Sequence, residues 1–233
     1  MPSGRNSVNS IIVGGLSPFT TIDFPTVTSA FVVFCQGCFW RCPYCQNRLL
    51  QPAKNSKLSW KNVFKEICQR KGFVEGVVFS GGEPLIQPAI MEGIQQVRAE
   101  GFRVALHTSG AVPRVLEKVL PLVDWVGFDI KAPFAKYEKV TFYGGSGRLA
   151  QTSLNILINS GVEFECRTTV YPKLLQQDDI LQIAQSLREI GVKTYALQEC
   201  FDKERLPMHS DCFAPEFLQK IEQCFQKFVV RKV

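Results

Sequence analysis

The chain has 233 residues, of which 45% are hydrophobic and 21% are charged, and its formal net charge is +6. This length suits one domain with a sizeable core, and the composition is that of a globular protein, which excludes a disordered chain. Residues 1–9 are polar and the apolar run that follows, Ile11–Val13, is short. We therefore expect no signal peptide and no membrane span, and we predict a cytoplasmic location.

The nine cysteines and the positive charge narrow the function classes further. Because the cytoplasm keeps thiols reduced, a disulfide framework is not expected, and metal binding or catalysis becomes the default interpretation. Residues 41–71 carry eight basic residues and one acid, Glu66, but the basic residues of the predicted helix in this segment lie where a solvated face would be. The charge thus favours an acidic cofactor or protein partner over nucleic acid.

Strand and helix signals alternate along most of the chain. Residues 1–27 contain prolines and a glycine pair that break helical periodicity, so we expect an extended N-terminal cover. Residues 28–34 are β-branched and aromatic without polar alternation, which predicts a strand buried on both faces of a parallel sheet. Further strands are predicted at 76–79, 102–107, 125–130, 164–171 and 193–198, and helices at 59–71, 88–100, 113–120, 149–160, 178–190 and 215–230.

These six strand–helix units predict an α/β fold, a partial (β/α)6 barrel with parallel strands, formed by residues 28–200. A closed eight-unit barrel takes about 250 residues, so an open barrel fits better. Residues 201–233 would add a C-terminal loop and helix, and no linker divides the single domain 1–233. Polar and glycine-rich segments follow the strands, and the carboxyl ends of parallel strands are where sites are built.

Four cysteines lie within the eleven residues Cys35–Cys45, directly after the first predicted strand. Zinc ribbons separate their cysteine pairs by about 12–20 residues, whereas three residues separate Cys38 from Cys42. A bacterial ferredoxin has part of this spacing but would not need the β-α units that follow. The remaining interpretation is that Cys38, Cys42 and Cys45 hold three irons of a [4Fe-4S] cluster and leave the fourth open.

The spacing Cys38-x3-Cys42-x2-Cys45, with Tyr44 before the last cysteine, resembles the signature of the radical S-adenosylmethionine (SAM) superfamily. The segment Ser80–Pro84, Ser-Gly-Gly-Glu-Pro, follows the second buried strand, where that superfamily places its Gly-Gly-Glu-Pro segment. The resemblance implies a barrel of the radical SAM type in which the open iron binds the amino and carboxylate groups of S-adenosylmethionine. It also implies cofactor-binding roles for Tyr44, Gly81, Gly82, Glu83 and Thr108.

Glu83 and Cys35 also have interpretations that involve no cofactor. Glu83 is expected to hold the methionine ammonium together with Gly81 and Gly82, but a solvated carboxylate in the first turn of a helix is the alternative. Cys35 is more typical of a small buried hydrophobic residue than of a ligand.

The whole chain is similar to activating enzymes of glycyl-radical enzymes, and most closely to the anaerobic ribonucleoside-triphosphate reductase activating proteins. The similarity rests on residues 17–25, on Phe34-Cys-Gln-Gly-Cys38, on Cys42-Pro-Tyr-Cys-Gln-Asn and on Asp129-Ile-Lys131-Ala-Pro with Tyr137. It implies that Asp129 and Lys131 lie near the sulfonium, Lys131 among the catalytic residues, although a salt bridge at the barrel rim is the alternative. The family often has His after the last cysteine and Asp-Thr-Asn-Gly after the third strand, where this chain has Gln46 and His107-Thr-Ser-Gly. His107 is therefore open to a structural or a ligand role.

The resemblance implies an oxygen-sensitive enzyme that takes one electron from a low-potential donor such as flavodoxin or ferredoxin and cleaves S-adenosylmethionine to a 5'-deoxyadenosyl radical. The radical would remove a hydrogen from a glycine of a partner, anaerobic ribonucleotide reductase. One alternative is a radical enzyme that acts on a small molecule or modified nucleoside, and another is a zinc-containing nucleic-acid-binding module.

Overall fold

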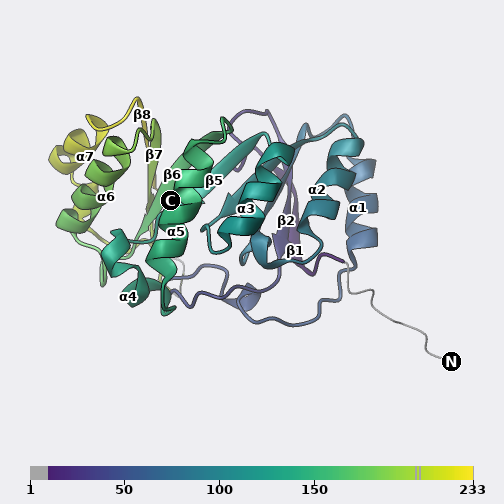
Figure 1. Cartoon of the computed structure of the whole chain (residues 1–233), viewed down its shortest axis with the longest axis horizontal. Helices are drawn as coiled ribbons and strands as arrows, with labels where there is room; N and C mark the ends of the chain where they lie inside the picture. The colour runs from purple at the N-terminus through teal and green to yellow at the C-terminus, as the bar shows by residue number, and fades with distance from the viewer. Residues whose placement is uncertain (1–9, 203, 205, 233) are drawn as a thin grey trace.

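The computed structural model describes residues 10–202, 204 and 206–232. Their framework is one eight-stranded sheet in which the strands follow each other in chain order (Figure 1). Strands β2 to β8 are parallel, while β1 runs antiparallel to β2. The strands are β1 Val13–Thr20, β2 Ala30–Cys35, β3 Gly76–Gly81, β4 Arg103–Thr108, β5 Trp125–Asp129, β6 Glu163–Val170, β7 Thr194–Glu199 and β8 Lys227–Arg231.

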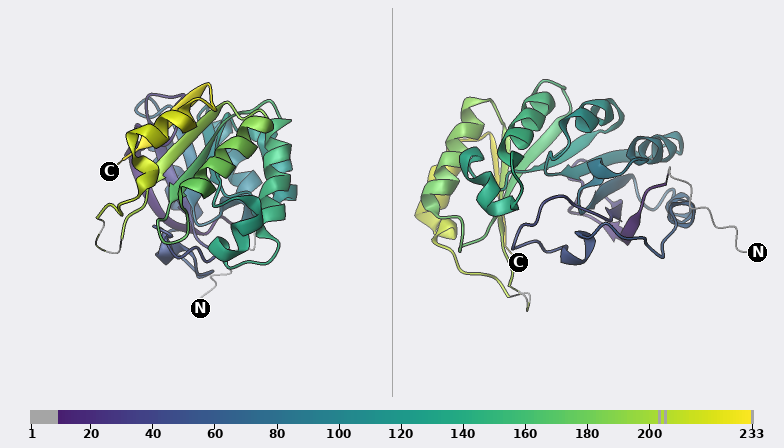
Figure 2. Two further views of the ribbon diagram at one scale, coloured as in Figure 1. Left: turned by 90° about the vertical axis from the view of Figure 1, so that its left-hand side faces the viewer. Right: turned by 60° about the horizontal axis from the view of Figure 1, so that its bottom comes forward.

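The helices cover the convex side of the curved sheet, and the sheet stays open between β1 and β8 (Figure 2, right). They are α1 Trp60–Gln69, α2 Ile90–Ala99, α3 Pro113–Val119, α4 Tyr137–Thr141, α5 Ser146–Ile158, α6 Gln177–Glu189 and α7 Pro215–Glu222. Short 3-10 helices are η1 Arg48–Leu50, η2 Pro84–Ile86, η3 Leu120–Leu122, η4 Phe134–Lys136 and η5 Asp211–Phe213. The architecture confirms the predicted partial α/β barrel. No helix among these described residues is long and apolar enough to cross a membrane.

The two ends of the chain differ from the prediction. The expected N-terminal cover is in part a sheet strand, β1, and the predicted helix over 215–230 ends at Glu222 and is followed by strand β8. Helical spacing of the apolar residues Phe217, Ile221, Phe225 and Phe228 suggested one continuous helix. In the structure the rings of Phe225 and Phe228 instead pack on Tyr195 of β7, at centroid distances of 4.8 and 6.2 Å.

The concave face of the sheet changes from apolar to polar along the strands. Near the amino ends of the strands a small buried cluster fills it, comprising Phe24, Ala30, Val32, Val78, Ala105 and Trp125. Side chains alternate between faces, so Gly127 and Asp129 follow Trp125 on this side of β5. A Cβ atom on Gly127 would lie 2.7 Å from the guanidinium carbon of Arg167. The glycine therefore makes room for an arginine at the carboxyl end, where polar groups gather.

Candidate active site

The cysteine loop and the Gly-Gly-Glu turn are held directly against each other. Cys35 ends β2 and pairs in register with Gly81, which ends β3. The Gly82 N–H donates to the Cys35 carbonyl (2.9 Å), and the Glu83 N–H donates to the Gly37 carbonyl (2.8 Å). Gly81 has a φ of +107°, and a Cβ on Gly82 would lie 2.1 Å from the Gly37 oxygen. Both glycines are therefore required for this close approach, which brings the two predicted motifs together.

The four cysteines of the loop differ in burial. Cys38 and Cys45 are partly exposed, Cys42 is 9% exposed, and Cys35 is fully buried in the core, as expected for a small hydrophobic residue. Burial raises the pKa of Cys38 to about 12 and raises that of Cys42, while the Lys131 ammonium lowers both. Within the described part of the chain, no three His, Cys, Asp or Glu side chains converge on a single-ion site.

Aromatic packing anchors this loop on the barrel. Trp40 is 1% exposed and meets the ring of Tyr137 edge-to-face at 5.8 Å. Tyr44, which lies between Cys42 and Cys45, is buried and stacks on Tyr171 after β6 at 5.4 Å. Burial raises the pKa of Tyr44 well above its usual value. Tyr44 is therefore a neutral ring that connects the cysteine loop to β6.

Asp129 and Lys131 occupy the carboxyl end of β5 as an ion pair, with 2.9 Å between Lys131 Nζ and Asp129 Oδ2. Arg167, which pairs with Asp129 in the register of β5 and β6, holds the other carboxylate oxygen at 2.9 Å. Burial alone would raise the pKa of Asp129, but Lys131 and Arg167 hold it well below its usual value. Asp129 is thus ionised between two cations. The charge of Lys131 also acts on Cys42 and Tyr44, whose pKa values it lowers.

Glu83 is fully buried, so the interpretation as a solvated carboxylate is wrong. Its Oε1 accepts from the Thr108 hydroxyl (2.6 Å) and from the Leu85 N–H (3.2 Å), and its Oε2 accepts from the N–H (2.9 Å) and hydroxyl (2.6 Å) of Ser109. Burial raises the pKa of Glu83, and the hydrogen bonds from Ser109 and Thr108 oppose that effect. The predicted residue Thr108 therefore lies at the site as a direct partner of Glu83.

His107, in β4, contacts other residues of the protein. Its Nε2 lies 2.7 Å from the Asp23 carbonyl oxygen, and its Nδ1 lies 3.4 Å from both Ser80 Oγ and Arg167 Nη1. Because the Arg167 guanidinium can only donate, Nδ1 accepts and Nε2 carries the proton. Burial and the Arg167 charge lower the pKa of His107 to about 3. His107 is therefore a neutral link between Arg167 and the loop after β1.

This burial predicts an acid-sensitive stability. The folded pKa of His107 is about 3 and its ordinary value is 6.5, so between these values the unfolded chain binds a proton that the folded chain does not. The free energy of unfolding should then fall as the pH falls below about 6.5, by about 1.4 kcal/mol per pH unit. Denaturant titrations from pH 7 to pH 5 should show this slope in wild type and lose it in His107→Gln. Parallel slopes in the two proteins would contradict it.

The site contains two residues, Arg167 and Ser109, that were not predicted from the sequence as site residues. Ser109 directly follows β4 and Arg167 lies in the carboxyl half of β6, near the edge where polar residues had already indicated a site. Their roles depend on strand register, which places Arg167 opposite Asp129.

Comparison with known proteins decides the family of this chain. The sequence profile of the Radical SAM superfamily matches residues 32–195, which is more than half of the chain and includes both motifs. The chain belongs to the radical SAM superfamily. A Methanocaldococcus jannaschii protein named "Putative glycyl-radical enzyme activating enzyme" is 30% identical over 95% of this chain and 96% of its own length. Pyruvate formate-lyase 1-activating enzyme of Escherichia coli is 27% identical over 85% of this chain and 82% of its length.

Solved structures agree on the fold of this radical SAM enzyme. SuiB of Streptococcus suis bound to S-adenosylmethionine superposes with a TM-score of 0.66, at 10% identity, over 84% of this chain and 48% of its own. A domain of the pyruvate-formate lyase-activating enzyme of Bacteroides vulgatus superposes with a TM-score of 0.52, at 16% identity, over 67% of this chain and 99% of its own. The sequence relatives place the chain in the glycyl-radical activating enzyme family, and the zinc-containing nucleic-acid module is set aside.

The cofactors of this radical SAM enzyme are a [4Fe-4S] cluster and S-adenosylmethionine, and the residues present fit both. The loop after the carboxyl end of β2 provides three thiols, Cys38, Cys42 and Cys45, which form a donor set suited to an iron–sulfur cluster. The Gly81–Glu83 turn is hydrogen-bonded to that loop. The charges of Asp129 and Lys131 are close enough to Cys42 to affect its pKa.

Proposed function

We propose that this enzyme installs a glycyl radical on anaerobic ribonucleotide reductase, with Cys38, Cys42 and Cys45 as the cluster ligands and a low-potential electron donor such as flavodoxin or ferredoxin. The observation that carries the proposal is the meeting of three motifs at one edge of the sheet. The cysteine loop, the Gly81–Glu83 turn and the Asp129–Lys131 pair are joined there by hydrogen bonds and charge.

When bound, the cofactors supply the radical chemistry: one electron from the cluster cleaves the sulfonium, and the resulting radical removes a hydrogen atom from a glycine of the partner. The chain's own residues would bind the cofactors and orient them. The backbone carbonyls of Gly81 and Gly82 suit a methionine ammonium because their oxygens are negatively polarised. Glu83, whose two oxygens already accept four hydrogen bonds, adds a buried negative charge next to them. Lys131 supplies a cation that its ion pair with Asp129 keeps charged and in place.

The choice of reductase as the partner rests on the segments that resemble its activating proteins, which are residues 17–25, 34–38, 42–47 and 129–133 together with Tyr137. Between Cys45 and Gly81 the chain has one further cysteine, Cys68, so this segment lacks the eight cysteines of the ferredoxin-like insert that several activating enzymes carry. This enzyme is then of the minimal kind with one cluster, and it depends on an external electron donor.

The test is anaerobic reconstitution with iron and sulfide, followed by reduction and a search for 5'-deoxyadenosine. The reduced protein should form it from S-adenosylmethionine. Addition of anaerobic ribonucleotide reductase should then produce a glycyl-radical doublet in the electron paramagnetic resonance spectrum. Pyruvate formate-lyase, added in a parallel sample, should give no doublet.

Three outcomes would count against the proposal. A doublet on pyruvate formate-lyase alone would change the partner. Formation of 5'-deoxyadenosine without a doublet on either protein would favour a small-molecule or nucleoside substrate. No 5'-deoxyadenosine at all would end the proposed chemistry.

A further inference from the structure

Three aromatic side chains beside the cysteine loop are exposed although large apolar residues are normally buried. Phe39, Phe142 and Tyr143 are 48%, 66% and 39% exposed, and we call these three residues the aromatic patch. The rings of Phe39 and Tyr143 stack at 6.2 Å, and the Arg41 N–H donates to the Thr141 carbonyl at 2.7 Å, which ties the loop to the end of α4. The patch therefore joins two segments that are about a hundred residues apart in the chain.

Phe142 is also held in an unfavourable backbone conformation. It follows α4 at the position where helices often end in a left-handed residue, with φ 51° and ψ 38°, and it is the one described non-glycine residue with a positive φ. Glycine is the usual residue at such a position, because a side chain there is strained. A strained backbone and an exposed aromatic ring both cost free energy in the isolated protein, which favours a contact of this residue with a partner.

The charge around the aromatic patch is positive. Within the cysteine loop, residues 35–45, the one charged residue is basic: Arg41, two positions after Phe39. Lys139 of α4, three residues before Phe142, and Arg148 of α5, five residues after Tyr143, are both exposed, and no ion pair among the described residues involves them. Glu138, the acid in this segment, accepts a hydrogen bond from the Gly145 N–H. An apolar patch flanked in the chain by Arg41, Lys139 and Arg148 complements an acidic protein surface.

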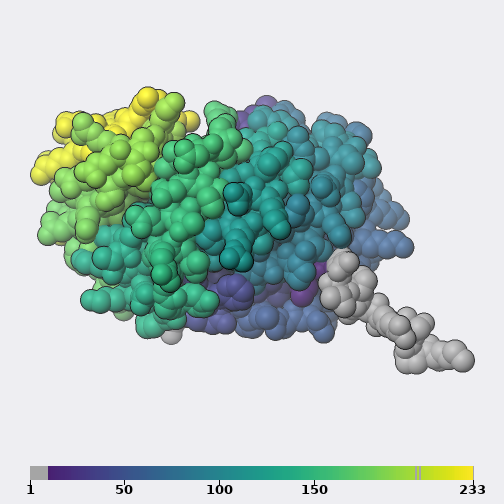
Figure 3. Space-filling view, in the orientation of Figure 1, coloured from purple at the N-terminus to yellow at the C-terminus, as the bar shows by residue number. Residues whose placement is uncertain are grey.

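We propose that the aromatic patch docks the electron-donor protein, a small acidic flavin or iron–sulfur protein, beside the cluster. This inference rests on the proposed function. Phe39 stands between the ligands Cys38 and Cys42, so a redox group placed on this patch is one side chain away from the cluster, as short-range electron transfer requires. The loop forms the lower edge of the molecule, where the blue and purple surface meets the teal surface of α4 (Figure 3).

The size and place of the patch favour the donor over the glycyl-radical partner. Three side chains make a small contact, and weak electron-transfer encounters have the smallest interfaces. The glycine of the large partner must reach the cofactor on the concave side of the sheet, where Asp129 and Arg167 lie. The donor needs only the outer side of the cluster, which the aromatic patch borders.

The test compares two sources of electrons. Phe142→Asn keeps a residue that tolerates the left-handed conformation, and Tyr143→Ala removes the second ring. With dithionite as reductant, both variants and their combination should form 5'-deoxyadenosine at the wild-type rate. With purified reduced flavodoxin or ferredoxin, the double variant should be slower by about tenfold or more. Lys139→Glu with Arg148→Glu should slow the protein-driven rate and weaken its dependence on salt.

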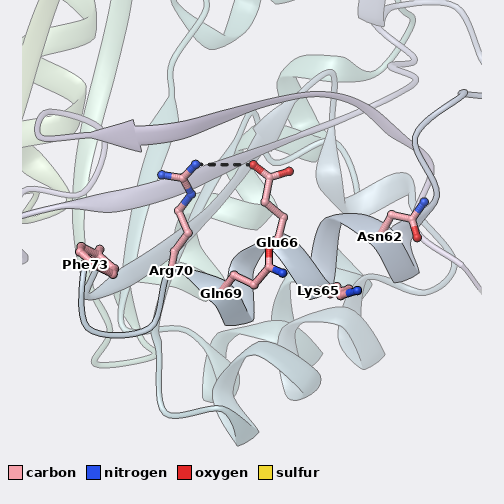
Figure 4. A pocket seen from close by; sticks show the side chains of 6 residues that line it. All are labelled: Asn62, Lys65, Glu66, Gln69, Arg70 and Phe73. Atoms are coloured by element: carbon pink, nitrogen blue, oxygen red, sulfur yellow. Dashed lines mark ion pairs between the residues drawn. The ribbon is translucent and has the colours of Figure 1, made fainter.

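The outer side of α1 offers matched controls. A hollow of about 700 Å³ there is lined by Lys65 and the 79% exposed Phe73, among others (Figure 4). Helix α1 lies at the opposite end of the molecule from α4 (Figure 1). Phe73→Ala and Lys65→Glu remove an exposed ring and reverse a charge away from the cluster, so both should keep the wild-type rate with every reductant.

Each other outcome overturns the docking proposal in a recognisable way. If the double variant equals wild type with both donors, or if wild type accepts electrons from dithionite and from neither donor, the patch does not dock a donor. Loss with dithionite as well would make the patch part of the site. Normal 5'-deoxyadenosine with a lost glycyl doublet under dithionite would assign the patch to the radical partner. Failure of the proposed function itself differs from all of these, since wild type would then form no 5'-deoxyadenosine with dithionite.

Discussion

Alanine in place of Cys38, Cys42 or Cys45 is expected to abolish cleavage of S-adenosylmethionine. Each thiol would hold one iron, and a cluster with two protein ligands is not expected to survive reduction. Cys35, the remaining cysteine of the loop, is not expected to replace them, because it is fully buried at the end of β2 and belongs to the core. Iron and sulfide content and the brown absorbance should fall sharply after anaerobic reconstitution, and 5'-deoxyadenosine should fall to the level without enzyme.

Cys68→Ala is the matched control for these changes. Cys68 lies in α1, on another element from the cysteine loop, so the variant should keep both the cluster and the activity. Cys35→Ala should also keep the cluster and lose only some stability, because it removes a buried sulfur from the core. Cofactor cleavage that survives the removal of all three loop cysteines would refute the assignment of the ligands.

The sequence predicted most of the site because its motifs follow strands of one parallel sheet. In such a sheet all carboxyl ends meet at the same edge. Cys38 after β2, Glu83 after β3, Thr108 at the end of β4 and Asp129 at the end of β5 had therefore to lie near one another. The prediction needed strand order and direction, and both are readable from alternating strand and helix signals.

Side-chain partners could not be predicted in the same way. Arg167 contacts Asp129 because β5 and β6 pair in one register, and a shift by a single residue would turn Arg167 to the other face of the sheet. Periodicity does not fix that register. The error at β8 has a related cause, since residues 217–228 have apolar spacing that a helix and a helix followed by a strand both satisfy.

Glu83 shows how burial changes an expectation that sequence alone suggests. The resemblance implies a carboxylate that holds the cofactor, and Glu83→Ala should then weaken cofactor binding while the cluster stays. The structure adds a second effect, because both carboxylate oxygens already accept hydrogen bonds from Leu85, Thr108 and Ser109. Alanine would leave these buried donors without a partner, each at a cost of about 1–3 kcal/mol.

We therefore expect Glu83→Ala to lower both the affinity for S-adenosylmethionine and the stability of the apoprotein. The two hydroxyls can rotate to other acceptors, so the expected net loss of about 2–4 kcal/mol is that of the two backbone N–H groups. It corresponds to a fall in Tm of about 4–16 °C for a chain of this size. Glu83→Gln is the matched variant: its carbonyl oxygen can keep Thr108 and Leu85, but its amide faces the Ser109 N–H, so its stability should lie between those of wild type and the alanine variant. Anaerobic calorimetry gives the stability and equilibrium binding gives the affinity. Reduced stability with unchanged affinity would remove Glu83 from the cofactor-binding residues, whereas reduced affinity with an unchanged Tm would show that its hydrogen bonds to β4 contribute little to the fold.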